Sequence, residues 1–213
     1  MPFGANPHAG GPILRRGPAA AQAKVAVVLL HGRGDSAAGI LGLADAFELP
    51  DVIWIAPQAA GHTWYPYSFL APMENNQPGL DSGLAVIGDL IETLSSEGVS
   101  AERVALMGFS QGACLAQEFA ARNARRYHAI IGLSGGLIGP PGTSRNYAGS
   151  FDGTPVFLGC SDIDPHIPVE RVHESAEVFA RMGAVVEKRI YPGMGHTVSL
   201  DEIRSVTALL RGK

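Results

Sequence analysis

Apolar runs of strand length alternate with segments of helical periodicity along the sequence, and this alternation constrains the fold more than any other feature. The strand-like runs stand at residues 25–30, 52–56, 104–107, 129–133, 156–159 and 185–191. The segments with helical spacing stand at residues 37–47, 84–94, 113–121, 169–182 and 200–210. Strands that alternate with helices form a mostly parallel sheet with helices on both faces. The sequence therefore predicts an α/β fold with a sheet of about six to seven strands and no large cap domain.

Length and charge restrict what the protein can be. A chain of 213 residues with 46% hydrophobic residues suits one core, so we expect a single domain over residues 1–213. The segment 1–20, which begins with a Gly-, Pro- and Ala-rich stretch, is expected to be flexible or peripheral. The net charge of −4 without basic clusters argues against nucleic acid as a partner. Because the sequence has no signal-peptide pattern and no membrane-length apolar stretch, we expect a cytoplasmic protein without stable membrane insertion.

A Gly-x-Ser-x-Gly motif, Gly108-Phe109-Ser110-Gln111-Gly112, lies between a strand-like run and a helical run. This order of strand, sharp turn and helix is typical of a nucleophile elbow. In such an elbow the two glycines leave room for a strained turn, and the serine hydroxyl stands above the sheet. We therefore expect Ser110 to be a nucleophile.

A second match to the same pattern is centred on Ser134 and also follows an apolar run. The residues after it, 137–142, are rich in Gly and Pro, so no helix can begin there. An elbow needs a helix N-terminus directly behind the serine to help polarise the developing oxyanion. The context therefore favours Ser110 over Ser134.

A serine nucleophile needs an imidazole to accept its proton and a carboxylate to orient that imidazole. In a parallel sheet these groups come from the carboxyl ends of strands. His196 follows the last strand and precedes the last helix, so it is the preferred base. Two carboxylates, Asp162 and Asp164, follow the preceding strand, and spacing alone leaves them nearly even, with Asp164 the first choice. In both cases the chain order of Ser, Asp and His is that of α/β hydrolases.

The oxyanion of the tetrahedral intermediate must be stabilised by backbone N–H groups, because this set of side chains cannot protonate it. The amide of Gln111, directly behind the serine, is one candidate donor. The amide of Arg33 is the other, because Gly32 and Gly34 on either side of it allow close backbone approach. His31 adjoins this turn and is expected to order it by hydrogen bonding.

The two cysteines, Cys114 and Cys160, do not indicate a metal or redox function. Neither belongs to a Cys/His pattern with the spacing of a zinc site, and neither stands at the elbow position. We expect two buried thiols and no metal.

A segment rich in Gly, Pro and aromatic residues, 57–79, connects the second strand-like run to the following helix. Loops longer than about 15 residues are uncommon in compact domains and are usually functional or disordered. Its aromatic rings either pack the loop or form the wall of a substrate pocket. We take Trp64 and Tyr65, with His31 and Arg33 from the neighbouring loop, as candidate substrate-binding residues. Whether the segment moves as a lid is left open.

Four short motifs follow one another along the chain. They are Leu30-His31-Gly32-Arg33-Gly34-Asp35, Gly108-Phe109-Ser110-Gln111-Gly112-Ala113, Asp162-Ile163-Asp164-Pro165-His166-Ile167-Pro168 and Tyr191-Pro192-Gly193-Met194-Gly195-His196. Together they resemble the motifs of the phospholipase/carboxylesterase family of small α/β hydrolases, which includes the acyl-protein thioesterases. The resemblance extends from about residue 25 to the C-terminus.

The resemblance implies hydrolysis of carboxylic esters or thioesters without a cofactor. It assigns the acid to Asp164, because the family's acid is the aspartate of an Asp-Pro-x-x-Pro motif. It also implies Ser110 and His196 as the partners of this acid, and the amides of Arg33 and Gln111 as the oxyanion donors.

One departure from the family affects the expected substrate. The thioesterases of the family carry an apolar residue where this chain has Arg33, which disfavours long-chain acyl groups. We therefore expect a carboxylesterase for small to medium esters, with a small-molecule ester as its partner. The alternatives are an acyl-protein thioesterase or lysophospholipase, a dienelactone-type hydrolase of an anionic ester, and a non-catalytic receptor. The sequence is compatible with a homodimer.

Overall fold

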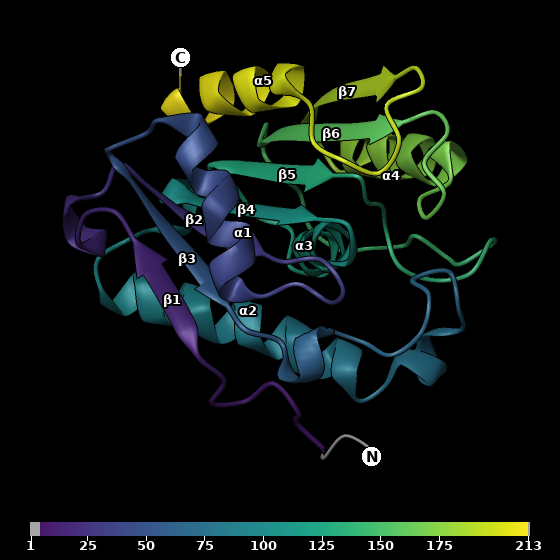
Figure 1. The fold of residues 1–213 in the computed structure, drawn as a ribbon, viewed down its shortest axis with the longest axis horizontal. Coiled ribbons are helices and arrows are strands. Elements are labelled where there is room, and N and C mark those ends of the chain that lie inside the picture. The colour runs from purple at the N-terminus through teal and green to yellow at the C-terminus, as the bar shows by residue number, and fades with distance from the viewer. Residues whose placement is uncertain (1–4, 213) are drawn as a thin grey trace.

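Seven strands form one sheet in the computed structural model, which describes residues 5–212 (Figure 1). Their order across the sheet is β1-β3-β2-β4-β5-β6-β7. All neighbouring pairs are parallel except β1 with β3. The strands are Ile13–Arg16 (β1), Val25–Leu30 (β2), Val52–Pro57 (β3), Val104–Phe109 (β4), Ala129–Leu133 (β5), Pro155–Ser161 (β6) and Val185–Tyr191 (β7). The predicted mostly parallel sheet is confirmed.

Five α-helices in the described range cover the two faces of this sheet (Figure 1). Residues of α1 and α5 pack on one face, and residues of α2, α3 and α4 pack on the other. The helices are Ala37–Ala44 (α1), Gly79–Ser96 (α2), Gln111–Arg122 (α3), Val169–Arg181 (α4) and Leu200–Arg211 (α5). Short 3-10 helices are Ala20–Gln22 (η1), Asp45–Phe47 (η2), Ala60–His62 (η3), Met73–Asn76 (η4) and Ala101–Arg103 (η5). The predicted helix over residues 37–47 is thus an α-helix that ends in a 3-10 turn.

The central strands are continuously apolar because helices cover both of their faces. All six residues of β2 are buried. Its odd-numbered residues lie in the core with α1 and α5, and its even-numbered residues in the core with α2, α3 and α4. Successive side chains of a strand point to opposite faces, so both sets must be apolar. Each fully buried side chain of this kind contributes about 1.5–3 kcal/mol to stability.

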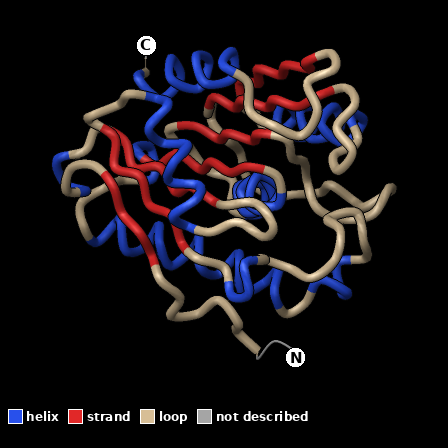
Figure 2. The backbone as a smooth tube through the Cα atoms, in the orientation of Figure 1, coloured by secondary structure: helices blue, strands red, loops and turns tan. Residues whose placement is uncertain are grey.

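The described part of the N-terminal segment, residues 5–20, lies at the periphery of the fold and is anchored there. Figure 2 shows it entering β1, which pairs antiparallel with β3 at the edge of the sheet, so this part is peripheral. It is not loose, however, because His8 is buried and contacts the 57–79 segment. Its Nε2 lies 2.9 Å from the carbonyl oxygen of Trp64, and its Nδ1 accepts the N–H of Ala60 at 3.0 Å. Residues 1–4, which the prediction also covers, lie outside the described residues.

The parallel strands bring their carboxyl ends to one edge of the sheet. Leu30 of β2 lies opposite Gly108 of β4, and Gly108 lies opposite Gly132 of β5. At the far side, Ser161 of β6 lies opposite Tyr191 of β7. The loops that follow these strands therefore emerge together, and they carry the residues of the site.

Candidate active site

Ser110 occupies the sharp turn between β4 and α3. Its backbone has φ 55° and ψ −119°, a conformation that residues other than glycine rarely adopt. The two glycines of the motif, Gly108 and Gly112, are required because other backbone atoms approach them too closely for a side chain. A Cβ on Gly108 would overlap with the carbonyl group of Gly112, and a Cβ on Gly112 would overlap with the carbonyl oxygen of Leu30. The turn has the geometry of the predicted nucleophile elbow.

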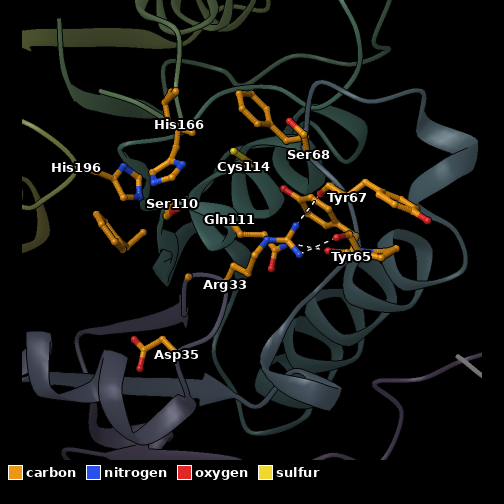
Figure 3. A pocket seen from close by; sticks show the side chains of 15 residues that line it. Arg33, Asp35, Tyr65, Tyr67, Ser68, Ser110, Gln111, Cys114, His166 and His196 are labelled. Carbon is orange, nitrogen blue, oxygen red and sulfur yellow. Dashed lines mark hydrogen bonds between the residues drawn. The ribbon is translucent and has the colours of Figure 1, made fainter. Parts of the chain in front are cut away.

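His196 lies between Ser110 and Asp164 and is hydrogen-bonded to both. Its Nε2 is 2.8 Å from Ser110 Oγ, and its Nδ1 is 2.7 Å from Asp164 Oδ2. Figure 3 shows the His196 ring beside Ser110, with His166 next to it. The rings of Phe109 and His166 contact the imidazole, with centroids 4.9 Å and 4.8 Å away. The structure thus brings together the three residues that the sequence predicts as nucleophile, base and acid.

The Asp164 carboxyl is fully buried and held by several hydrogen bonds. Its Oδ1 accepts the N–H groups of His166 at 2.8 Å and Ile167 at 3.0 Å, and its Oδ2 faces His196. Burial raises the pKa of this carboxyl, but the hydrogen bonds from His196 and the two amides outweigh burial and leave the pKa below its ordinary value. Asp164 is therefore ionised at neutral pH and can fix the orientation of His196.

The neighbouring aspartate, Asp162, has a different environment. It is exposed, and its Oδ1 accepts the N–H of Gly193 at 2.8 Å. Asp162 thus ties the loop after β6 to the loop after β7, which carries His196. Of the two carboxylates that spacing leaves nearly even, only Asp164 reaches the imidazole.

Ser134, the second match to the motif, also has a positive φ, of 51°. Its side chain is buried, however, and its Oγ has no oxygen or nitrogen partner within residues 5–212. It does not line the cavity beside Ser110. The structure therefore separates the two serines as the context of their motifs predicts.

A cavity of about 590 Å³ opens beside Ser110. Its wall is formed by Gly32, Arg33, Asp35, Tyr65, Pro66, Tyr67, Ser68, Phe69, Phe109, Ser110, Gln111, Cys114, His166, Ile167 and His196. Aromatic rings form much of this wall, with a few polar groups between them, as in many small-molecule sites. Figure 3 shows Ser110 and His196 on one side of the cavity and Tyr65 and Tyr67 on the other.

The backbone amides of Arg33 and Gln111 stand close to Ser110. A Cβ added to Gly32, directly before Arg33, would lie 3.4 Å from Ser110 Cβ. Gln111 follows Ser110 at the start of α3. In the described part of the chain, neither of the two N–H groups donates to a backbone carbonyl. Both N–H groups are therefore available to a ligand oxygen next to Ser110.

The side chains of these two residues hold the wall of the cavity. Figure 3 shows the Arg33 guanidinium bonded to this wall: its Nη1 donates to Pro66 O at 2.9 Å and its Nη2 to Tyr67 O at 2.6 Å. The side-chain amide nitrogen of Gln111 donates to Tyr65 O at 2.8 Å, and the side-chain oxygen accepts the N–H of Trp64 at 2.9 Å. Because the loop after β2 and the start of α3 both anchor this wall, we expect it to stay in place during turnover and not to swing as a lid.

Two of the four predicted substrate-binding residues lie behind the wall of the cavity. Arg33 and Tyr65 line the cavity, but His31 and Trp64 are fully buried and do not. His31 Nε2 accepts the N–H of Ala59 at 3.1 Å, and Trp64 Nε1 donates to His31 O at 3.0 Å. This burial argues against contact of His31 and Trp64 with a substrate, because both side chains are used to order loops. For His31 this agrees with the ordering role that its position suggests.

Several lining residues were not among the predicted ones. Cys114 lies four residues after Ser110 on α3, so helical periodicity places the two on the same side of the helix. That signal was present in the sequence. Phe109 precedes Ser110, and Ile167 follows Asp164 by three residues. Nothing in the spacing of these two residues distinguishes them from core residues. Their contribution to the wall is decided by tertiary packing.

Other features of the described residues lie outside this chemistry. Both cysteines are buried free thiols, as expected, and burial raises the pKa of each to about 12. Within residues 5–212 no three His, Cys, Asp or Glu side chains are grouped so that they could hold a metal ion. None of the helices in that range has the length and apolar character needed to cross a membrane.

Comparison with known proteins connects this geometry to a family. A family model described as phospholipase/carboxylesterase matches residues 17–212. Acyl-protein thioesterase 1 of Gibberella zeae is 27% identical over 221 residues, which cover 91% of this chain and 92% of that protein. A crystal structure of a phospholipase/carboxylesterase from Dyadobacter fermentans matches with a TM-score of 0.91 and 46% identity, over 94% of this chain and 97% of that chain. Esterase PE8 matches with a TM-score of 0.76 and 27% identity, over 94% and 97% of the two chains.

These matches cover nearly the whole chain, and the fold is that of an α/β hydrolase. The resemblance that the four sequence motifs indicate is thereby confirmed. The protein belongs to the phospholipase/carboxylesterase family of α/β hydrolases, whose members hydrolyse carboxylic esters.

Proposed function

We propose that the protein hydrolyses small to medium carboxylic esters through an acyl-enzyme on Ser110. The observation that carries this proposal is the continuous path of hydrogen bonds from Ser110 through His196 to the buried Asp164 carboxylate, at the wall of the cavity. The link between Ser110 and His196, 2.8 Å long, is within the range over which a general base takes a proton. The link between His196 and Asp164, 2.7 Å long, is a hydrogen bond that can orient the imidazole. A serine in a strained turn next to such a base is the arrangement that nucleophilic catalysis needs.

The proposed reaction proceeds in two halves. In the first, His196 Nε2 takes the proton of Ser110 as Oγ attacks the ester carbonyl carbon, and the carbonyl oxygen becomes an oxyanion. Asp164 keeps Nδ1–H of the imidazole directed toward itself and stabilises the imidazolium. The alcohol then leaves with the proton from Nε2, and the acyl group remains on Ser110. In the second half, water attacks the acyl-enzyme with the same proton transfers and releases the acid.

The amides of Arg33 and Gln111 are proposed to donate to the oxyanion. Their N–H groups have no backbone acceptor in the described part of the chain and lie next to Ser110. Donors of this kind are fixed before the reaction begins, so no reorganisation is needed when the charge forms. The loss of one such donor lowers the rate by about 10²–10³ in other enzymes.

A thioesterase or lysophospholipase that acts on long acyl chains is the second candidate. The relatives named acyl-protein thioesterase 1 favour it. The charged side chain of Arg33 on the cavity wall disfavours it, because a long apolar chain would have to pass a guanidinium. A non-catalytic receptor is a third candidate, but it gives no reason for a hydrogen-bonded path to a buried carboxylate.

Initial hydrolysis rates for p-nitrophenyl esters from acetyl to palmitoyl test this proposal. We expect the highest rate with short chains, and a loss of at least about three orders of magnitude in Ser110→Ala. Ser134→Ala is the matched control, because Ser134 is the other serine in a Gly-x-Ser-x-Gly motif and lies outside the cavity. We expect it to retain its activity.

The other possible results of these rate measurements would support a different mechanism or function. Full activity in Ser110→Ala would exclude the proposed mechanism. A long-chain optimum would favour the thioesterase, and no hydrolysis at any chain length would favour the receptor. A cytoplasmic location and a homodimer remain predictions from the sequence, to be checked by fractionation and by the mass of the protein in solution.

A further inference from the structure

We propose that the acyl side of the cavity binds a carboxylate, so that the preferred substrates are esters whose acyl group carries a second, free carboxylate. This inference rests on the proposed esterase function and specifies its substrate class. Two features of the same wall carry it. One is the guanidinium of Arg33, which has no acidic partner within residues 5–212. The other is the buried hydroxyl of Tyr65, which in the same range has no oxygen or nitrogen partner and only the Cys114 thiol beside it.

The charge of Arg33 is held in place but not neutralised. Its three hydrogen bonds go to Thr63 Oγ1 at 3.0 Å, Pro66 O at 2.9 Å and Tyr67 O at 2.6 Å, and all of these acceptors are uncharged. No carboxylate within residues 5–212 forms an ion pair with it, whereas six of the other twelve arginines have such a partner. A guanidinium fixed in this way is preorganised, and it still has N–H groups that can bind a carboxylate.

The hydroxyl of Tyr65 is the second feature. Tyr65 is only 1% exposed, yet no oxygen or nitrogen atom among the described residues is a hydrogen-bond partner of its hydroxyl. The Cys114 thiol is its near neighbour and lines the cavity too, but a thiol is a weak partner. The Arg33 guanidinium carbon lies 5.9 Å from the centre of the Tyr65 ring, so both features belong to one region of the wall. A ligand oxygen that reached this hydroxyl would be a stronger hydrogen-bond partner than the thiol is.

The reaction geometry places this region on the acyl side. His196 must deliver its proton to the departing alcohol, so the alcohol lies on the side of the cavity formed by His196 and His166. The acyl group then extends away from these histidines, toward the loop of Arg33. Figure 3 shows Tyr65 and the Arg33 side chain on the side of the cavity opposite His196.

One negative charge also lies on the cavity wall, and its position matters. Asp35 is exposed, and its carboxylate lies over Gly39 in the first turn of α1. The N–H groups of that turn offset its charge. Figure 3 shows Asp35 well apart from Tyr65 and from the tip of the Arg33 side chain. The acyl region near Arg33 and Tyr65 therefore favours an anion.

The test compares charged and uncharged esters of equal length with the full-length protein. Monomethyl esters of dicarboxylic acids, from succinate to adipate, are hydrolysed in a pH-stat beside the matching methyl alkanoates. We expect kcat/KM for the best half-ester to exceed that of its uncharged counterpart about tenfold at low salt. High salt should reduce this ratio because it screens an exposed guanidinium.

Three variants of the wall separate the effect of the Arg33 charge from the effect of an ordered loop. In each variant we measure the ratio of kcat/KM for the half-ester to kcat/KM for its uncharged counterpart. Arg33→Gln removes the charge, and the ratio should fall about tenfold. Arg33→Lys keeps the charge but loses the bonds to the loop, so most of the preference should remain. Thr63→Val is the matched control, because it loosens the same loop without changing any charge. It should affect both esters alike.

Tyr65→Phe tests the hydroxyl by itself. If the hydroxyl binds the carboxylate, the ratio should fall severalfold, whereas a hydroxyl that only packs in the wall would leave the ratio unchanged. The proposal is overturned if the wild type prefers the uncharged ester at every length and salt concentration, or if Arg33→Gln slows both esters equally. In both cases, hydrolysis that is lost in Ser110→Ala would still support the proposed esterase function. A rate on uncharged esters that survives Ser110→Ala would instead contradict the proposed function itself.

Discussion

At the scale of single residues, the site uses two aspartates of one short loop in different ways. Asp164 is buried and accepts hydrogen bonds from His196 and two backbone amides. Asp162 is exposed and accepts the N–H of Gly193. The two side chains are chemically identical, so burial and partners alone assign one to the imidazole and the other to loop geometry.

Asp164→Asn is expected to lower kcat by about three to four orders of magnitude while the fold remains intact. The reason is that an amide neither stabilises the imidazolium nor selects the tautomer in which Nδ1 carries the proton. Asp162→Asn is the matched control, because its amide oxygen can still accept the N–H of Gly193. It should retain most of its activity. Rates with the best p-nitrophenyl ester and a circular dichroism spectrum check this, and equal losses in both variants would exclude the assigned role of Asp164.

At the scale of elements, the site depends on how closely α3 approaches the end of β2. Residues 111–121 of α3 are all buried, and the backbone of Gly112 lies against the carbonyl groups of Leu30 and His31. This approach places Ser110 beside Gly32 and keeps the two candidate oxyanion amides near each other. The position of the nucleophile is therefore a property of the packing between helix and strand.

Gly112→Ala should push α3 away from β2 and thereby displace Ser110. We expect a loss of about 1–3 kcal/mol in the free energy of unfolding, as for other overpacked sites, and a large loss of esterase rate. Gly42→Ala is the matched control, because Gly42 is exposed in α1 and an added Cβ meets no atom within 4 Å. It should stabilise the protein by up to about 1 kcal/mol. Denaturant unfolding and ester hydrolysis measure both effects, and an active, stable Gly112→Ala would contradict this account.

At the scale of the whole molecule, three buried or half-buried histidines connect segments far apart in the chain. His8 joins the N-terminal segment to the 57–79 segment, His31 orders the loop after β2, and His128 lies 3.2 Å from Leu210 O of α5. Burial lowers the pKa of all three, and their backbone hydrogen bonds offset this only in part. The native fold therefore favours the neutral form of these rings.

Stability should fall as the pH is lowered through about 6.5, the ordinary histidine value, toward the lower pKa values of the folded state. In that window the unfolded chain binds protons that the folded protein does not, so protonation favours unfolding. The raised pKa of buried Glu202 acts in the opposite direction, so the comparison is made between variants. His8→Asn should weaken the pH dependence, because it removes one of the rings whose pKa is lowered by burial. Urea unfolding between about pH 7.5 and pH 5 measures this, and the same slope in the wild type and His8→Asn would contradict it.

Elements that depend on local pattern were predictable, and elements that depend on distant partners were not. The parallel strands and the helices follow from periodicity, because the pattern of apolar residues within each segment predicts which side chains are buried. All four residues of β1 are exposed, so no alternation marks this strand, and it exists through its pairing with β3. His8 likewise looks like part of a loose segment until Trp64 and Ala60 provide its partners.

The sequence by itself determined the α/β order of elements, the elbow at Ser110 and the choice between the two serines, because each depends on residues next to one another. The tertiary structure decided which carboxylate meets His196, why His31 and Trp64 lie behind the wall, and where the Arg33 side chain is held. These contacts join residues far apart in the chain, such as Ser110 and His196, which are separated by 86 positions. Which side chains meet across such distances is set by the packing of strands and helices, and no local pattern specifies it.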